Sequence, residues 1–298
     1  MRSPARRAPR DADSLWRWAT LSPALLLMAA LGLLPVLNLF VLGFFDVRWT
    51  DGGSSWSFVG TRHYAALPGD PLFRASILNT TLFALGAVAG QMLLGFALAL
   101  LCHKATRGRV FWRAVFVLPV LIPGIVIGAM WKLLLNPEFG AIAQVFEMVE
   151  LEPVDWLGEA STALLAVIMV DIWHWTPFCF LLFLAGLESL PRDVYEAARV
   201  DGARGWQELR YITLPLMWPT IVVTFVFRLV LAFKVFDEVY LLTGGGPGTA
   251  TEVVAFTIYQ RFFTEDRAGY GSAMAVAVIF LIFLMLAAAA AARRRVQS

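Results

Sequence analysis

The sequence predicts an all-α membrane protein that crosses the bilayer about six times, and three observations support this prediction. Hydrophobic residues make up 59% of the 298-residue chain and charged residues only 15%, whereas a soluble domain is about half apolar and a quarter charged. Six apolar segments reach the roughly 20 residues that a membrane-spanning helix needs. The Lys and Arg residues gather in alternate connecting segments, as they do when those segments face the cytoplasm.

The six predicted spans occupy residues 20–45, 77–102, 114–135, 162–187, 217–242 and 272–292. The first follows a basic N-terminus, as a secretory signal does, but its apolar run is too long for a signal core and no clear cleavage site follows. We therefore expect it to stay in the mature protein. The fifth is the weakest, because four charged residues between Arg228 and Glu238 interrupt it. Its apolar core should shrink to 217–233, with an irregular outer end.

The distribution of positive charge predicts that both termini lie in the cytoplasm. With that orientation the inner segments carry 16 Lys and Arg residues and the outer segments carry 5, as the positive-inside rule requires. The chain then divides into a basic cytoplasmic tail at 1–19, a transmembrane domain at 20–292 and a cytoplasmic tail at 293–298. The outer segment 136–161 contains six acids and no Lys or Arg. Such a run is typical of a solvated face, with contact to an external partner as the alternative.

A polar block at 188–215 separates the fourth and fifth spans, and it predicts two short helices around a glycine elbow. Pro191 suits the start of the first helix, and Gly202 permits a reversal that a Cβ would hinder. The alanines that follow Glu196 provide a small apolar face. Such a helix can seat in a groove on a partner, with Glu196 paired to a basic residue there. The alternative is an amphipathic helix that lies on the bilayer surface.

The spacing of this block resembles the EAA loop of permease subunits in binding-protein-dependent ABC importers. Glu196-Ala-Ala is followed by Gly202 and, after nine intervening residues, by Ile212-x-Leu214-Pro215. The segment Leu242-Thr-Gly-Gly-Gly-Pro247 further resembles the carbohydrate-uptake branch, and within it the first permease of maltose, trehalose and glycerol-phosphate systems. The likeness covers the chain from about residue 78 to residue 263.

This resemblance implies a permease of the bacterial inner membrane that is not itself an enzyme. Its expected partners are a second homologous permease, two cytoplasmic ABC ATPase subunits, a periplasmic sugar-binding protein and the lipid bilayer, with no nucleic acid. The Gly-rich run lacks the Gly-Lys-Ser/Thr ending of a phosphate loop, so ATP and Mg²⁺ are expected on the ATPase subunits and no cofactor or metal on this chain. The coupling contact with an ATPase is expected at Glu196, Ala197, Ala198, Asp201 and Gly202.

Two faces of the fourth and fifth spans predict a solute site. Ionisable residues within spans are costly and indicate function, and a sugar site needs flat aromatic surfaces together with a few polar groups. Helical spacing places four residues on each face, and the resemblance puts the membrane sugar site on these same spans. The eight candidates are Asp171, His174, Trp175, Phe178, Arg228, Leu231, Ala232 and Val235. The alternative is that Asp171 pairs with Arg228 to hold two helices together while the aromatic residues only pack.

Other functions stay open at this point. A stand-alone ion-coupled carrier or a membrane enzyme is the second hypothesis, with Asp171 and His174 as its only hint. An importer of the same mechanism for amino acids, polyamines or phosphate is the third. Within the carbohydrate reading, disaccharides, polyols and glycerol-phosphate-like solutes remain possible. Lys234, which precedes Asp237 and Glu238 by three and four residues, predicts an ordinary ion pair at a helix end.

Overall fold

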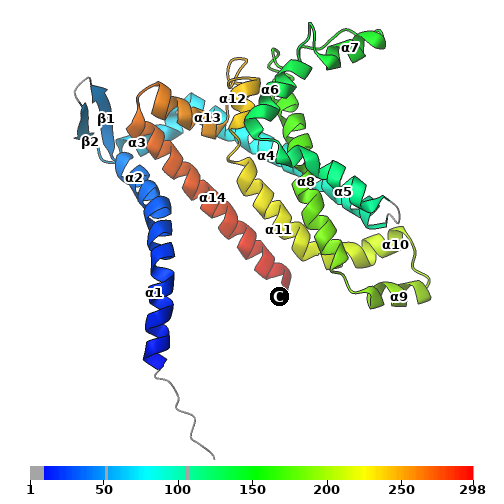
Figure 1. Cartoon of the computed structure of the whole chain (residues 1–298). Coiled ribbons are helices and arrows are strands. Elements are labelled where there is room, and N and C mark those ends of the chain that lie inside the picture. The colour runs from blue at the N-terminus through cyan, green and yellow to red at the C-terminus, as the bar shows by residue number, and fades with distance from the viewer. Residues whose placement is uncertain (1–9, 51–52, 105–107, 298) are drawn as a thin grey trace, which may run out of the picture. The chain divides into compact units, whose positions relative to one another are not determined.

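The computed structural model of the chain describes residues 10–50, 53–104 and 108–297, and most of them are helical. Among these residues, five helices are long and apolar enough to cross a membrane, and a bent helix pair would provide a sixth span. The chain divides into two compact units, Met1–Ala65 with Arg261–Ala277, and Ala66–Gln260 with Val278–Ser298. Figure 1 labels their helices and strands.

The first unit contains one long apolar helix and a small hairpin. Helix α1 (Arg10–Met28), a π-helical turn (Ala29–Leu33) and α2 (Leu34–Leu42) follow one another, and the candidate span within them is Trp16–Leu42. Strands β1 (Phe45–Thr50) and β2 (Gly53–Phe58) then pair antiparallel, and α3 (Arg62–Ala66) follows. The hairpin is a departure from the all-α prediction, and its register places Phe45 opposite Phe58 and Val47 opposite Trp56. Val47 of β1 is buried beside Leu42 and Ala268.

The second unit is built on two long helices packed side by side. Helix α4 (Pro71–Lys104) lies along α8 (Ala163–Glu188), and α11 (Leu214–Ala232) contacts both. Glycines of α4 allow this close approach: a Cβ added at Gly95 would lie 2.7 Å from the Cβ of Cys179. Small residues at such crossings replace the hydrophobic driving force that helices lack within lipid. The second and fourth predicted spans are confirmed by these two helices.

The third predicted span is not one straight helix. Helix α5 (Arg109–Val117) and a 3₁₀ turn (Leu118–Leu121) are followed by α6 (Gly124–Leu134), and the two arms of the pair enclose a bend of 95°. The prediction of continuous helix over 114–135 was wrong because Pro119 and Pro123 fall inside it. Each proline removes a backbone donor and clashes with the preceding turn. Helix α7 (Ala141–Met148) follows α6.

The fifth span is also interrupted, as predicted. Helix α11 ends at Ala232, and a separate helix α12 (Asp237–Leu242) begins after an irregular stretch. The expected ion pair of Lys234 with Asp237 and Glu238 is not formed between these described residues, because residues 233–236 are not helical and the i,i+3 and i,i+4 geometry is lost. Glu238 contacts His174 instead. The apolar core that surrounds both interruptions includes Phe83, Ile127, Val167 and Val239.

The Gly-rich run after α12 is a folded connection. Gly244 and Gly245 have φ of 59° and 86°, values that favour glycine. The hydroxyl of Thr251 donates to the carbonyl of Gly246 at 2.7 Å, and the amide of Asn79 on α4 donates to the carbonyl of Thr249 at 2.7 Å. Helix α13 (Val254–Tyr259) and a π-helical turn (Gln260–Thr264) follow, and α14 (Ala268–Gln297) contains the last predicted span.

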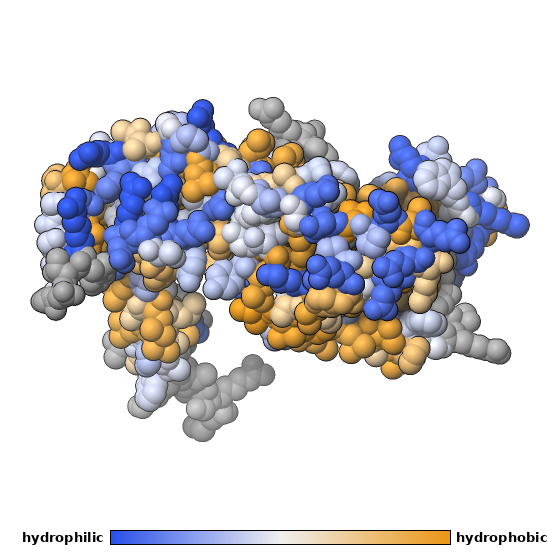
Figure 2. Space-filling view, turned by 90° about the horizontal axis from the view of Figure 1, so that it is seen from above, coloured by the Kyte–Doolittle hydropathy of each residue, from blue (hydrophilic) through white to orange (hydrophobic). Residues whose placement is uncertain are grey.

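The polar block forms the opposite end of the second unit from α6 and α12 (Figure 1). Helix α9 (Arg192–Val200) ends in a turn, and α10 (Trp206–Glu208) continues through a π-helical turn (Leu209–Thr213) into α11. The view from above shows hydrophilic residues gathered over the visible face and hydrophobic residues along its margins (Figure 2).

Candidate functional site

A cavity of about 300 Å³ lies beside the interruptions of the third and fifth spans. Side chains from α8, α11 and α12 line it, together with the start of α6. The lining residues are Gly124, Asp171, His174, Trp175, Arg228, Leu231, Lys234, Val235, Phe236, Asp237 and Glu238. Irregular backbone within a membrane is tolerated where it is buried in protein or borders a cavity, so this location is where a functional site is expected in a broken-span protein.

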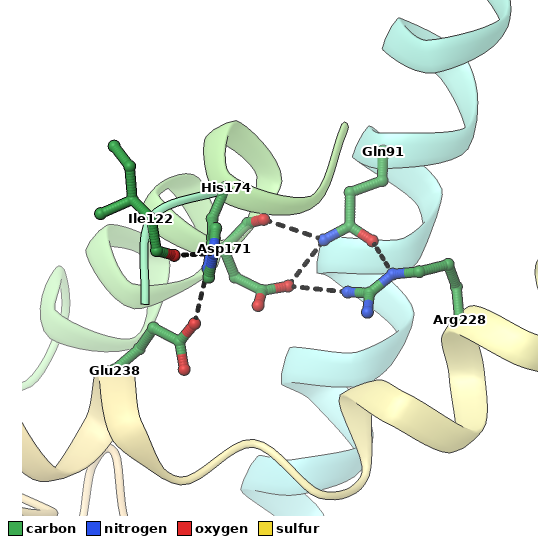
Figure 3. A network of polar contacts seen from close by, with 6 residues as sticks. All are labelled: Gln91, Ile122, Asp171, His174, Arg228 and Glu238. Carbon is green, nitrogen blue, oxygen red and sulfur yellow. Dashed lines mark hydrogen bonds and ion pairs between the residues drawn. The ribbon is translucent and has the colours of Figure 1, made fainter. Parts of the chain in front are cut away.

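A buried ion pair forms one wall of the cavity. The guanidinium of Arg228 donates from Nε to Oε1 of Gln91 at 2.8 Å and from Nη2 to Oδ2 of Asp171 at 3.3 Å. The amide of Gln91 donates to the same Asp171 oxygen at 2.6 Å and to the Asp171 carbonyl at 3.1 Å. Figure 3 shows these contacts. The three residues come from α4, α8 and α11, so the pair ties the three helices together, as the structural alternative for Asp171 and Arg228 predicted.

A second branch of the same wall centres on His174. Its Nδ1 lies 2.9 Å from Oε1 of Glu238, and its Nε2 lies 3.2 Å from the carbonyl oxygen of Ile122 (Figure 3). We call the six residues drawn in Figure 3 the polar network: Gln91, Ile122, Asp171, His174, Arg228 and Glu238. Its charged members are almost fully buried, and buried charges in proteins are generally paired, as these are.

The aromatic candidates separate into two positions. Trp175 lines the cavity, and the Arg228 guanidinium lies over its ring at 4.6 Å from the ring centre, within the range of a cation–π contact. Phe178 stacks on Phe227 instead, with ring centres 5.4 Å apart, and does not line the cavity. The structure therefore brings a flat ring and a charged group together at one point of the wall.

The aliphatic candidates also divide. Leu231 and Val235 line the cavity, whereas Ala232 is 2% exposed and belongs to the apolar core. Six of the eight predicted solute-site residues thus share one cavity, and Phe178 and Ala232 lie outside its lining.

Sequence reasoning missed three members of the polar network. Gln91 was detectable, because it is a polar residue in the middle of an otherwise apolar predicted span. Glu238 was assigned to a local ion pair, because its contact with His174, 64 residues away in the sequence, depends on tertiary packing. The carbonyl of Ile122 had no signal of its own beyond the proline that follows it, which leaves the preceding residues outside a regular helix.

The five predicted coupling residues lie at the other end of the unit, on and after α9. Glu196, Ala197, Asp201 and Gly202 are exposed and Ala198 is half-buried, and Gly202 has a φ of 85° as the elbow requires. The helix is held in place by two contacts, from Tyr195 to the Thr213 hydroxyl at 3.0 Å and from Arg199 to Glu208 at 3.2 Å. Val200, the last residue of the helix, is 88% exposed. A second cavity of about 900 Å³ lies beside α9 and includes Glu196 in its lining.

These features define a class of protein: a multi-pass helical membrane protein with a polar cavity between interrupted spans and an exposed helix at one end. Comparison with known proteins then identifies its family. Residues 91–298 match the family described as binding-protein-dependent transport system inner membrane component, and the chain belongs to this family.

Several curated relatives are permeases of sugar transport systems. The chain is 36% identical over 225 residues to the trehalose/maltose transport system permease protein MalF of Thermococcus litoralis, with 76% of each protein covered. It is 35% identical over 269 residues to the sulfoquinovosyl glycerol transport system permease protein SmoG of Agrobacterium fabrum, which covers 90% of this chain and 87% of SmoG. These relatives confirm both the permease family and the carbohydrate-uptake branch that the motifs predicted.

The fold has a counterpart among solved structures. A chain in the crystal structure of a bacterial ABC transporter involved in the import of the acidic polysaccharide alginate superposes with a TM-score of 0.85. The match covers 97% of this chain and 99% of the other at 24% sequence identity, a level that supports a shared fold. The family match and the permease relatives show that the protein is a permease subunit of an ABC importer.

Proposed function

We propose that this chain forms, with a second homologous permease, the translocation path for a carbohydrate across the bacterial inner membrane. A periplasmic binding protein delivers the solute, and two cytoplasmic ATPase subunits bind ATP and Mg²⁺ and drive transport. The named substrates of the relatives support this choice, since the systems of MalF, of the starch-degradation permease AmyD of Thermoanaerobacterium thermosulfurigenes and of the multiple-sugar permease MsmF of Streptococcus mutans all carry sugars.

The 300 Å³ cavity is the proposed solute site of this subunit, and the single observation that carries it is the placement of Trp175 against Arg228. The indole offers a flat surface for the CH groups of a sugar ring. Lys234 and Asp237 are exposed at the same cavity and provide polar groups for hydroxyls. In this arrangement Asp171 and His174 shape the wall, Leu231 and Val235 add apolar contact, and Phe178 and Ala232 support the site from behind.

Helix α9 is the proposed contact for an ATPase subunit. This requires both termini in the cytoplasm, an orientation supported by the excess of Lys and Arg on the segments assigned to the inside. The exposed Val200 and the small residues Ala197 and Ala198 suit a groove on the partner, and the exposed carboxylate of Glu196 suits a basic residue there. Closure of the ATPase pair would then move α9, and α10 would transmit that movement to α11 because the two are continuous through a π-helical turn.

The first experiment is to purify the tagged chain from its native membranes in mild detergent and to identify what accompanies it by mass spectrometry. We expect a second permease and an ATPase. The complete complex, reconstituted with its binding protein, should take up radiolabelled sugar only when ATP is present. A chain that is stable alone and carries a solute without an ATPase would instead establish the stand-alone carrier.

A second experiment tests the solute site within the reconstituted complex. Trp175→Leu removes the flat ring from the cavity and should raise the KM for uptake about tenfold, since one aromatic stacking contact is worth about 0.5–1.5 kcal/mol beyond its area. Trp173→Leu is the matched control, because it removes the same indole ring from the same helix at a position outside the cavity lining, and it should leave the KM unchanged. Equal effects of the two substitutions would contradict the placement of the site.

A further inference from the structure

The two interrupted spans meet at His174, and the structure gives this residue a role beyond lining a cavity. His174 belongs to α8, which is continuous from Ala163 to Glu188. Its Nε2 contacts the carbonyl of Ile122, two residues before the start of α6, and its Nδ1 contacts Glu238, the second residue of α12. One side chain on an unbroken helix is therefore hydrogen-bonded to the backbone at one interruption and to a side chain just beyond the other.

Helices α6 and α12 also pack tightly against each other. Gly124 and Gly128 lie four residues apart and hence on one face of α6. A Cβ at Gly124 would lie 3.0 Å from Oδ2 of Asp237, and a Cβ at Gly128 would lie 2.7 Å from the Cβ of Leu241. Spacing of two small residues by four is the arrangement that lets membrane helices approach most closely. The arms of the two spans beyond their interruptions thus form one packed pair, which we call the α6–α12 pair.

The hydrogen bonds of His174 depend on a proton between the ring and Glu238. The Ile122 carbonyl can only accept, so Nε2 must carry a hydrogen. Nδ1 then either donates to an ionised Glu238 or accepts from a protonated one, and in both states a single proton lies between the two groups. A glutamine at position 238 would keep this arrangement, because its amide can donate to an unprotonated Nδ1. An alanine would abolish it.

We propose that His174 is a positioning residue that fixes the α6–α12 pair against α8 and so sets the wall of the solute cavity. This rests on the proposed function only in taking the cavity as the solute site. Both ring nitrogens are already engaged, so His174 offers a solute no free hydrogen-bonding group. We call the two hydrogen bonds of His174, to Ile122 and to Glu238, the His174 clamp. When the clamp is lost, the α6–α12 pair separates from α8, and the cavity loses the fixed geometry that couples solute movement to ATP hydrolysis.

The test measures the position of α6 directly, in the complete transporter and without solute. Spin labels at Leu93→Cys on α4 and Leu133→Cys on α6 occupy exposed positions, in a background with Cys102→Ser and Cys179→Ala. We expect a narrow distribution of the distance between the two labels in the protein with His174 and Glu238 intact. His174→Phe keeps an aromatic ring but neither hydrogen bond and should broaden the distribution. Glu238→Ala should broaden it as well. Glu238→Gln should stay narrow. Solute transported per ATP hydrolysed should fall about tenfold in the two broadened variants, the order expected for lost hydrogen bonds to a charged group.

A narrow distribution in His174→Phe would overturn the proposal, and so would a Glu238→Gln variant that broadens as much as Glu238→Ala. If the His174→Phe variant does not assemble into the transporter, the comparison between Glu238→Gln and Glu238→Ala is sufficient to test the role of His174. The outcome is separable from the proposed function: a complex that carries no carbohydrate refutes the function, whereas the distance distributions still report on the clamp.

Discussion

Arg228 shows at the scale of one residue how a membrane interior treats a charge. Its side chain is 1% exposed, and a charge in such a place is stable only when it is paired and hydrogen-bonded. Asp171 and Gln91 meet that condition through three of the hydrogen bonds drawn in Figure 3. The charge of the guanidinium that stacks on Trp175 is therefore already balanced by Asp171. Its role at the cavity is to fix the position of the Trp175 ring.

Removal of one partner from this pair should be far more damaging than removal of both. Arg228→Leu leaves a buried carboxylate without its partner and should lower the free energy of unfolding by about 3–5 kcal/mol. The double variant with Asp171→Leu should lose less stability than either single variant, because no unpaired charge is then left buried. Denaturant unfolding of the purified protein in detergent measures the free energy of unfolding of the two single variants and of the double variant.

An exposed pair provides the control for that prediction. Arg199 and Glu208 are 3.2 Å apart, with side-chain exposures of 65% and 17%, and such a pair contributes at most about 1 kcal/mol. Arg199→Leu should therefore have a small effect. If Arg228→Leu proved equally mild, the buried network would have no structural importance.

At the scale of the element, the α6–α12 pair depends on two glycines. Gly128→Ala adds a methyl group that meets Leu241 at 2.7 Å, and such overpacking costs about 1–3 kcal/mol. We expect a lower unfolding temperature and a lower transport rate. Ala129→Leu, which places a larger group on the neighbouring exposed position, should change neither. Wild-type stability in Gly128→Ala would indicate that the two helices are free to separate.

Helix α9 provides a second prediction at this scale. Glu196→Lys reverses the charge of an exposed residue, so the fold should be unaffected while binding of the ATPase subunit and sugar uptake both fall at least about tenfold, because like charges juxtaposed at an interface cost several kcal/mol. Co-purification and uptake assays measure the two effects. Glu147→Lys, an exposed acid on α7, should retain the ATPase. Normal coupling in Glu196→Lys would remove α9 from the proposed contact.

At the scale of the whole molecule, the prediction concerns which side of the membrane each connecting segment faces. With both termini in the cytoplasm, a fluorescent protein fused to the C-terminus should fluoresce, and alkaline phosphatase fused after Glu150 should be active because that segment would face the periplasm. Phosphatase fused after Arg204 should be inactive. Activity at Arg204 together with inactivity at Glu150 would invert the assigned topology and exclude α9 as the cytoplasmic contact.

Most of the fold was predictable because membrane spans are encoded by local composition. The continuous helices α4 and α8 match the predicted spans closely, since about 20 apolar residues in lipid have few alternatives to a helix. The prediction of an unbroken third span failed for a local reason that was visible in the sequence, namely the prolines at 119 and 123. The hairpin of β1 and β2 was not predicted, although residues 45–50 alternate apolar and polar side chains, because a two-stranded pair depends on cross-strand contacts that hydropathy does not report.

The candidate site likewise contains a part that was predictable from local sequence and a part that was not. Helical spacing within one span brought Asp171, His174 and Trp175 to one region, because a helix fixes which residues share a face. The partners of these residues lie far away in the sequence: Gln91 is 80 residues from Asp171, and Glu238 is 64 residues from His174. Such pairings depend on how helices are placed against each other, which residue spacing does not encode.

The sequence by itself determined the approximate extent of most apolar spans, the family and the elbow at Gly202, because hydropathy, motif spacing and glycine chemistry are all local properties. Only the tertiary structure decided that Arg228 pairs with Asp171 and donates to Gln91, that Phe178 and Ala232 lie outside the cavity lining, and that His174 contacts both interrupted spans. The physical reason is that burial and pairing of a charge are properties of the surroundings that other helices supply, and those surroundings exist only after the helices have packed.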